Sequence, residues 1–286
     1  MQYRPFGATG MRLSEIALGG LLARYEGACG HPPPDVKRRI YLEAAERGIN
    51  LFDMGYGDEV HIPDELKGND PDRYFSLKVG APKSEDLEAT VDKHLTNIRR
   101  DTIDILRVHH NAYMGDDALR DVIASLKQSE KIRTLCLIRH YRDDQEAYAE
   151  QGPANEADAD LVMYNYVCRW QEPGIEKSAA SGKGVLIMKS LGGQWLGWDD
   201  KIRPDWAEVR KEDLEQYAPK GEKIRNNLEL IHPVSVGPWH ELAAPGETRP
   251  RTSAAVQWVL RNQGVSSILV AVASVAELDE VVGEEG

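Results

Sequence analysis

The chain has 286 residues, enough for one large domain or two small ones, so its length alone does not choose between them. Lys and Arg total 35 against 47 Asp and Glu, giving a net charge of −12, which argues against nucleic acid as the main partner because phosphate binding relies on clustered positive charge. No export signal and no apolar run of membrane-spanning length is present, and the three cysteines are scattered, so we expect a soluble cytoplasmic protein that does not bind membranes.

Short apolar runs rich in β-branched residues alternate with segments of helical period throughout the chain. A hairpin is predicted over residues 1–12, and a short helix near Asp64–Lys67 is the weakest of the predicted units. The strands predicted in the first half are Glu15–Gly19, Asn50–Met54, Tyr74–Val79 and Thr102–Val108. Three helices are predicted between and after them: one that begins at Asp35, one that contains Leu87–Ile98 and one that contains Leu119–Leu126.

The second half repeats the same alternation. Its predicted strands are Ile132–Ile138, Asp160–Tyr164, Val185–Met188 and Ser267–Ala271, with helices over 143–150, 173–181 and 252–262 and a last one from Val275. Ser274 and Glu277 form an S-x-x-E capping box at the start of that last helix.

Eight strands, each followed by a helical segment, favour an α/β fold of the (β/α)8 TIM-barrel type, which needs about 250 residues. We therefore expect one barrel domain over residues 1–286. No G-x-G-x-x-G follows the first strand, which argues against a Rossmann domain. A long insertion after the seventh strand, between Gly192 and Pro250, contains four tryptophans, and connections of that length are usually functional.

Polar residues stand at the carboxyl ends of many predicted strands, where barrels of this type carry their active sites. Any one of them could be an ordinary solvated rim residue. Asp53 and Lys78, however, lie within apolar strands. The whole set consists of Asp53, Lys78, His109, Arg139, His140, Asn165 and Lys189.

Nearly end to end, the chain resembles the aldo-keto reductases. YRPFGATGMRLSEIALGG is similar to the family's N-terminal hairpin and first strand, and GINLFDMGYGDE is similar to its GINFFDTA…YG segment. FSLKVG, DTIDILRVHH, YNYVCRWQE and TSAAVQWVLRNQGVSSILVAVAS resemble the later units in the right order. MKSLGG resembles an iron–sulfur-associated subgroup, although the C-terminal cysteine cluster of that subgroup does not occur here.

The resemblance implies a catalytic tetrad of Asp53, Tyr56, Lys78 and His109. A phenol has a pKa near 10, and an ammonium held by a carboxylate would lower it. Tyr56 could then protonate the carbonyl oxygen of a small aldehyde or ketone while a nicotinamide supplies hydride, with a neutral His109 orienting that oxygen.

The implied cofactor is NADP(H) or NAD(H). The resemblance assigns its binding to Gly20, Asn165, Met188, Lys189, Ser190, Leu191, Ser274 and Glu280. Glu277 stands where the family usually has Gln or Arg near the phosphate end of the nucleotide, and Val281 stands where Asn is usual. Because a carboxylate repels a 2′-phosphate, Glu277 predicts little preference for NADPH.

Other departures from the family pattern concern both halves of the site. Tyr56 falls three residues after Asp53, whereas five is usual, so either a shorter loop still brings it to the site or it is a rim aromatic. The Ser-Asn pair that holds the carboxamide is replaced around Ile138–His140, and Leu161 stands where a Gln is expected. The catalytic half thus resembles the family better than the cofactor half.

Two alternatives to a carbonyl reductase remain open. One is a nucleotide-independent lyase, isomerase or dehydratase on the same scaffold, and the other is a non-catalytic regulatory subunit. We expect no metal site, because the adjacent His109 and His110 would point to opposite faces of a strand.

Overall fold

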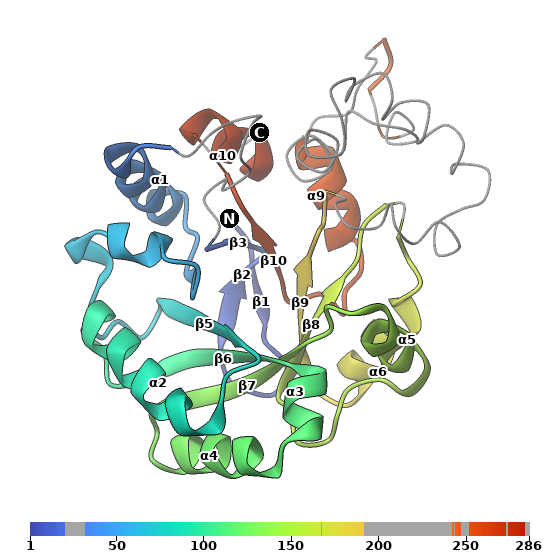
Figure 1. The fold of residues 1–286 in the computed structure, drawn as a ribbon. Helices are drawn as coiled ribbons and strands as arrows, with labels where there is room; N and C mark the ends of the chain where they lie inside the picture. Colours follow the sequence, from blue (N-terminus) through green and yellow to red (C-terminus); the bar gives the residue numbers. More distant parts are fainter. Residues whose placement is uncertain are drawn as a thin grey trace, which may run out of the picture.

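The computed structural model describes residues 1–20, 32–166, 168–191, 242, 244–246, 252–272 and 274–283. Eight parallel strands form a closed barrel in which the last strand pairs with the first (Figure 1). The strands are β3 (Ile16–Leu18), β4 (Leu51–Met54), β5 (Tyr74–Gly80), β6 (Ile103–His109), β7 (Ile132–Ile138), β8 (Ala159–Met163), β9 (Gly184–Met188) and β10 (Ser267–Val270). The predicted (β/α)8 barrel is confirmed.

Helices surround the ring of strands (Figure 1). They are α1 (Pro34–Glu46), α2 (Ser84–Ile98), α3 (His110–Gly115), α4 (Asp117–Gln128), α5 (Arg142–Gln151), α6 (Glu172–Ala180), α9 (Thr252–Leu260) and α10 (Val275–Val282). In the described part of the chain, no helix is long and apolar enough to cross a membrane.

Two stretches differ from the regular alternation. Between β4 and β5 there are only two 3-10 turns, η1 (Asp58–His61) and η2 (Asp64–Leu66), in place of a full helix. This is the unit that the sequence predicted as weakest, and Pro63 between the turns interrupts the hydrogen bonding that a longer helix needs. The predicted 192–250 insertion lies almost entirely outside the described residues.

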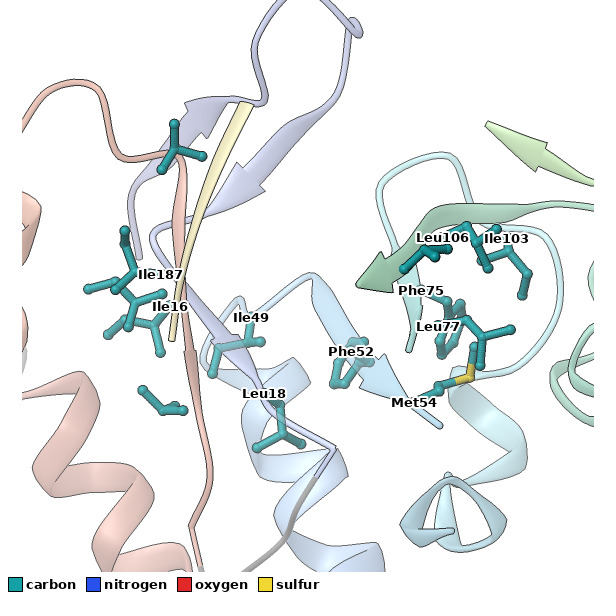
Figure 2. Packing of buried hydrophobic residues seen from close by; sticks show 14 of the residues in the cluster. Ile16, Leu18, Ile49, Phe52, Met54, Phe75, Leu77, Ile103, Leu106 and Ile187 are labelled. Atoms are coloured by element: carbon teal, nitrogen blue, oxygen red, sulfur yellow. The ribbon is translucent and has the colours of Figure 1, made fainter. Parts of the chain in front are cut away.

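Alternating side chains of each strand face opposite sides of the barrel wall. The outward residues pack against the helices; Phe52 of β4 and Phe75 of β5 lie beside one another there, with ring centroids 6.0 Å apart (Figure 2). A second cluster fills the barrel interior and includes Leu51 of β4 and Ile105 of β6. Counting two residues onward from these interior positions gives Asp53 and Arg107, so the same alternation turns both toward the barrel axis.

The N-terminal hairpin closes the amino-terminal end of the barrel. Strands β1 (Tyr3–Pro5) and β2 (Arg12–Ser14) pair in antiparallel fashion, and the residues between them carry Phe6 into the interior cluster. Phe6 is fully buried against Gly184, where a Cβ atom would lie 2.4 Å from its ring. The hairpin therefore plugs the closed end and leaves the carboxyl-terminal mouth for a site.

Replacing the plug should destabilise the barrel. We expect Phe6→Ala to lower the free energy of unfolding by about 3–5 kcal/mol, because it removes a fully buried aromatic ring and leaves a cavity. Urea denaturation followed by circular dichroism measures the change, with Val60→Ala at a 62% exposed position as the control. Equal midpoints for the two variants would contradict this role of the hairpin.

Candidate active site

A cavity of about 370 Å³ opens at the carboxyl-terminal mouth of the barrel. It brings together Asp53, Tyr56 and Lys78 from the predicted tetrad. The sequence-predicted cofactor residues that line it are Gly20, Met188, Lys189, Ser190 and Leu191. Much of the remaining wall is formed by Arg107, Ile138, His140, Leu161 and Leu269. Of these, only His140 was among the strand-end candidates named from the sequence.

Asp53 lies near the end of β4 and is 2% exposed. One of its carboxylate oxygens, Oδ1, accepts a hydrogen bond from the Met54 backbone N–H at 3.0 Å and a short ion-paired contact from Nη2 of Arg107. Burial raises the pKa of Asp53, and the Arg107 guanidinium opposes that rise. This buried carboxylate is held in place by the backbone of its own strand and by a guanidinium from β6, two strands away.

Tyr56 lines the cavity despite its shortened spacing from Asp53. Gly55 and Gly57 on either side have φ of 96° and 91°, angles that favour glycine, and they let the chain return tightly over the mouth. Glu59 fixes this return by accepting hydrogen bonds from the backbone N–H groups of Tyr56 and Gly57 at 3.3 and 2.7 Å.

The phenol ring packs closely on Gly20. A Cβ atom at position 20 would lie only 2.3 Å from Cδ2 of Tyr56, so a larger residue there would push the ring away. The hydroxyl lies 3.4 Å from Nη2 of Arg107. Burial raises the pKa of Tyr56, while the charge of Arg107 acts in the opposite direction.

Lys78 does not make the ion pair that the chemistry of the tetrad suggested. Its ammonium lies 5.1 Å from the centroid of the Tyr56 ring, over the ring face, and none of the ion pairs among the described residues includes it. Asp53 is bonded to Arg107 instead, because β6 turns that longer side chain into the barrel, where it reaches across β5 to β4. Burial and the charge of Arg107 lower the pKa of Lys78.

Arg107 lines the cavity but was not among the residues predicted from the sequence. It is 1% exposed, inside the barrel directly beneath the cavity. Burial alone would lower its pKa, but the adjacent Asp53 carboxylate raises it, so the guanidinium stays charged. Strand alternation could have predicted the position of Arg107, because residues 105, 107 and 109 of the strand Ile103–His109 share a face. An arginine on the interior face of an apolar strand requires a partner for its charge.

The rings of His109 and His140 stack, with their centroids 5.7 Å apart. His140 lines the cavity, whereas His109 lies behind it with its Nδ1 atom buried and without a hydrogen-bond partner among the described residues. Burial lowers the pKa of His109, as does the charge of Lys78, and burial lowers that of His140 to about 4. Both imidazoles are therefore neutral at physiological pH.

Three sequence-predicted cofactor residues lie away from the lining of this cavity. The buried Asn165 amide donates to the Lys189 carbonyl at 2.9 Å and so supports the loop that does line it. The Ser274 hydroxyl accepts from the Glu277 N–H at 3.1 Å as the cap of α10, and Glu280 accepts from the Thr252 hydroxyl at 2.6 Å. These contacts stabilise the elements around the cavity.

The two residues that follow β7, Arg139 and His140, turn their side chains in different directions. Arg139 is buried in a 2.7 Å ion pair with Asp160, and its guanidinium lies over the ring of Tyr148 in α5. His140, the next residue, faces the cavity. Of the two polar residues that replace the family's Ser-Asn pair, only His140 is therefore available to a ligand.

The lowered pKa of His140 predicts acid sensitivity of the fold. Between the folded value of about 4 and the usual unfolded value of about 6.5, the unfolded chain binds more protons, so stability falls as the pH drops through this window. We expect His140→Asn to lose less stability than the parent over the same range. Urea midpoints at several pH values measure this, and identical acid sensitivity of the two proteins would contradict it.

Comparisons with known proteins agree with this fold. The model of the Aldo/keto reductase family matches residues 15–284, whereas curated protein sequences give no significant match. Among solved structures, an aldo-keto reductase from Bacillus halodurans in its holo form is 18% identical, with 99% of this chain and 90% of that chain covered and a TM-score of 0.67. A Pseudomonas aeruginosa protein assigned to the aldo-keto reductases is 20% identical, with 98% and 92% covered and a TM-score of 0.63. Since the family model covers most of its length, the chain belongs to the aldo/keto reductase family.

Proposed function

We propose that this protein reduces the carbonyl group of a small aldehyde or ketone in the cytoplasm, with NADH or NADPH as the hydride donor and Tyr56 as the general acid. The observation that carries the proposal is the position of the Tyr56 side chain in the cavity at the barrel mouth: its hydroxyl lies 3.4 Å from a guanidinium, and an ammonium lies over its ring. Membership of the family supports an oxidoreductase of this type.

The cavity suits the nicotinamide end of the nucleotide. Its apolar wall, which includes Leu161, Met188 and Leu269, is suited to packing against a flat ring. Because Gly20 has no side chain, the ring of Tyr56 can pack closely against the backbone beside this wall. His140, neutral at physiological pH, would bond the carboxamide, and the backbone of Lys189–Leu191 would border the ribose. When bound there, the reduced nicotinamide supplies the hydride.

The chain's own residues handle the proton. Burial keeps Tyr56 protonated at neutral pH, so its O–H is available to the carbonyl oxygen as negative charge develops there. As the O–H bond breaks, the positive charges of Arg107 and Lys78 stabilise the phenolate that remains. A neutral His109, whose ring stacks on the cavity-lining His140, would help to orient the carbonyl oxygen from beside the cavity.

One observation favours the nucleotide-independent lyase, isomerase or dehydratase as the second candidate. The apolar Leu161 lines the cavity where a carboxamide-binding side chain was expected, and Arg139 points away from it. Titration with NADH and NADPH, followed by quenching of the six tryptophans, separates the two. Saturable quenching favours the reductase, and its absence together with turnover of a hydroxy-acid or hydroxyketone substrate favours the alternative.

Replacing Tyr56 by Phe tests the general acid. Tyr56→Phe keeps the ring packed on Gly20 and removes only the hydroxyl. We expect reduction of a model carbonyl such as 4-nitrobenzaldehyde to fall about 10²–10⁴-fold while nucleotide binding persists. The exposed Tyr3→Phe serves as the matched control. If Tyr56→Phe reduces the aldehyde as fast as the parent, another residue gives the proton, and His140 would be tested next.

The acidic residues of α10 predict the coenzyme preference. Glu277 and Glu280 lie in the first two turns of this helix, near the expected phosphate end, where negative charge repels a 2′-phosphate. We expect NADPH to be favoured weakly or not at all, and Glu277→Gln to shift the preference toward NADPH. Dissociation constants for both coenzymes measure this. A preference for NADPH above about 100-fold in the parent, roughly 2.7 kcal/mol, would contradict the prediction.

A further inference from the structure

The carboxylate of Asp53 has two candidate cations, Lys78 and Arg107, and the structure pairs it with only one of them. Nη2 of Arg107 bonds Oδ1 of Asp53, and both side chains are almost completely buried. The same nitrogen lies 3.4 Å from the Tyr56 hydroxyl. One guanidinium thus joins the carboxylate to the phenol, an arrangement that Lys78, over the face of the ring, does not make.

The two cations also differ in how firmly they hold their charge. A guanidinium is protonated at any pH at which proteins fold, and Asp53 strengthens that tendency here. Lys78 is half-buried beside a second positive charge, and both factors favour the loss of its proton. As the pH rises, Arg107 is the positive charge that remains next to the phenol.

We propose that Arg107 is a positioning residue for the proton transfer: it fixes Asp53 and the Tyr56 hydroxyl and supplies the permanent positive charge that stabilises the Tyr56 phenolate. This inference rests on the proposed function for its consequence in catalysis. The electrostatic link between Arg107 and Tyr56 stands on the geometry of the two side chains alone.

The charged groups that face Tyr56 come from four elements. They are Asp53 of β4, Lys78 of β5, Arg107 of β6 and Glu59 of η1, whose carboxylate binds the backbone at Tyr56. Asp53 opposes Arg107, because its negative charge disfavours a phenolate. The effect of Arg107 on the ionisation of Tyr56 is therefore measured in a protein in which residue 53 is already neutral.

The experiment compares Asp53→Asn with Asp53→Asn/Arg107→Met, using Asp53→Asn/Lys78→Met as the matched control. Tyr56 is replaced by 3,5-difluorotyrosine in each protein, so that its ionisation falls at a lower pH and can be followed by 19F NMR without substrate or coenzyme. We expect Arg107→Met to raise the ionisation midpoint by at least about one pH unit, a tenfold change in the ionisation constant. Lys78→Met should raise it less.

An unchanged midpoint in the Arg107→Met protein, or a larger shift with Lys78→Met, would overturn the proposal. If the double variant does not fold, a second substitution at position 107 makes the same comparison. For this fallback the residue at position 107 must be neutral, so glutamine is used in place of methionine (Asp53→Asn/Arg107→Gln); the positive charge is then lost, the midpoint should again rise, and an unmoved midpoint counts against the proposal.

Catalysis gives the second readout. In the Asp53→Asn background, we expect Arg107→Met to lower kcat for 4-nitrobenzaldehyde at least about tenfold with little change in KM, because the charge acts on the proton transfer and not on binding. Undiminished activity of Tyr56→Phe would defeat the proposed function and leave the 19F result intact. A collapse of Tyr56→Phe with no 19F shift on Arg107→Met would defeat this inference alone.

Discussion

The ion pair between Asp53 and Arg107 spans the inside of the barrel mouth, and the site above it depends on this contact. Each residue would be costly alone, because burying an unpaired charge requires its full desolvation. Together they connect β4 to β6 across the intervening β5, and they form the floor on which Tyr56 lies. The pair therefore has a structural and a chemical consequence. The order of the strands in the barrel brings the two partners together, and their charges act in opposite directions on the pKa of Tyr56.

Much of this arrangement could be predicted from the chain itself. The eight strands and their carboxyl-terminal residues follow from apolar runs and helical periods. A shorter loop that still brings Tyr56 to the site was one of the two alternatives that the sequence left open, and Tyr56 does line the cavity. The partner of Asp53 could not be obtained in this way. Period two places Arg107 on the inner face, but whether its guanidinium reaches Asp53 depends on barrel radius and strand stagger, which no local pattern encodes.

The cofactor half was harder to predict for a related reason. Met188–Leu191 follow a strand and line the cavity as the resemblance implied, whereas Asn165 binds the backbone of that loop from outside the lining. Arg139 and His140 are adjacent in sequence yet turn to opposite sides, one to Asp160 and the other to the cavity. A departure from a family motif shows which side chain is missing from the site. Only the path of the backbone shows which neighbouring side chain faces the cavity instead.

The pairing of β3 with β10 bears on how the barrel is made. Ile16 opposes Ile268, so a strand near the start of the chain obtains its second neighbour from one near the end. During synthesis β3 can pair with β4 early, but its other edge stays unpaired until nearly all of the protein has emerged. The interior cluster that contains Phe6 of the hairpin also stays incomplete until then. Open edges recruit other strands, and contacts so distant in sequence form slowly. The nascent chain should therefore be most prone to aggregation just before its last strand arrives, a vulnerability of assembly that the finished barrel no longer displays.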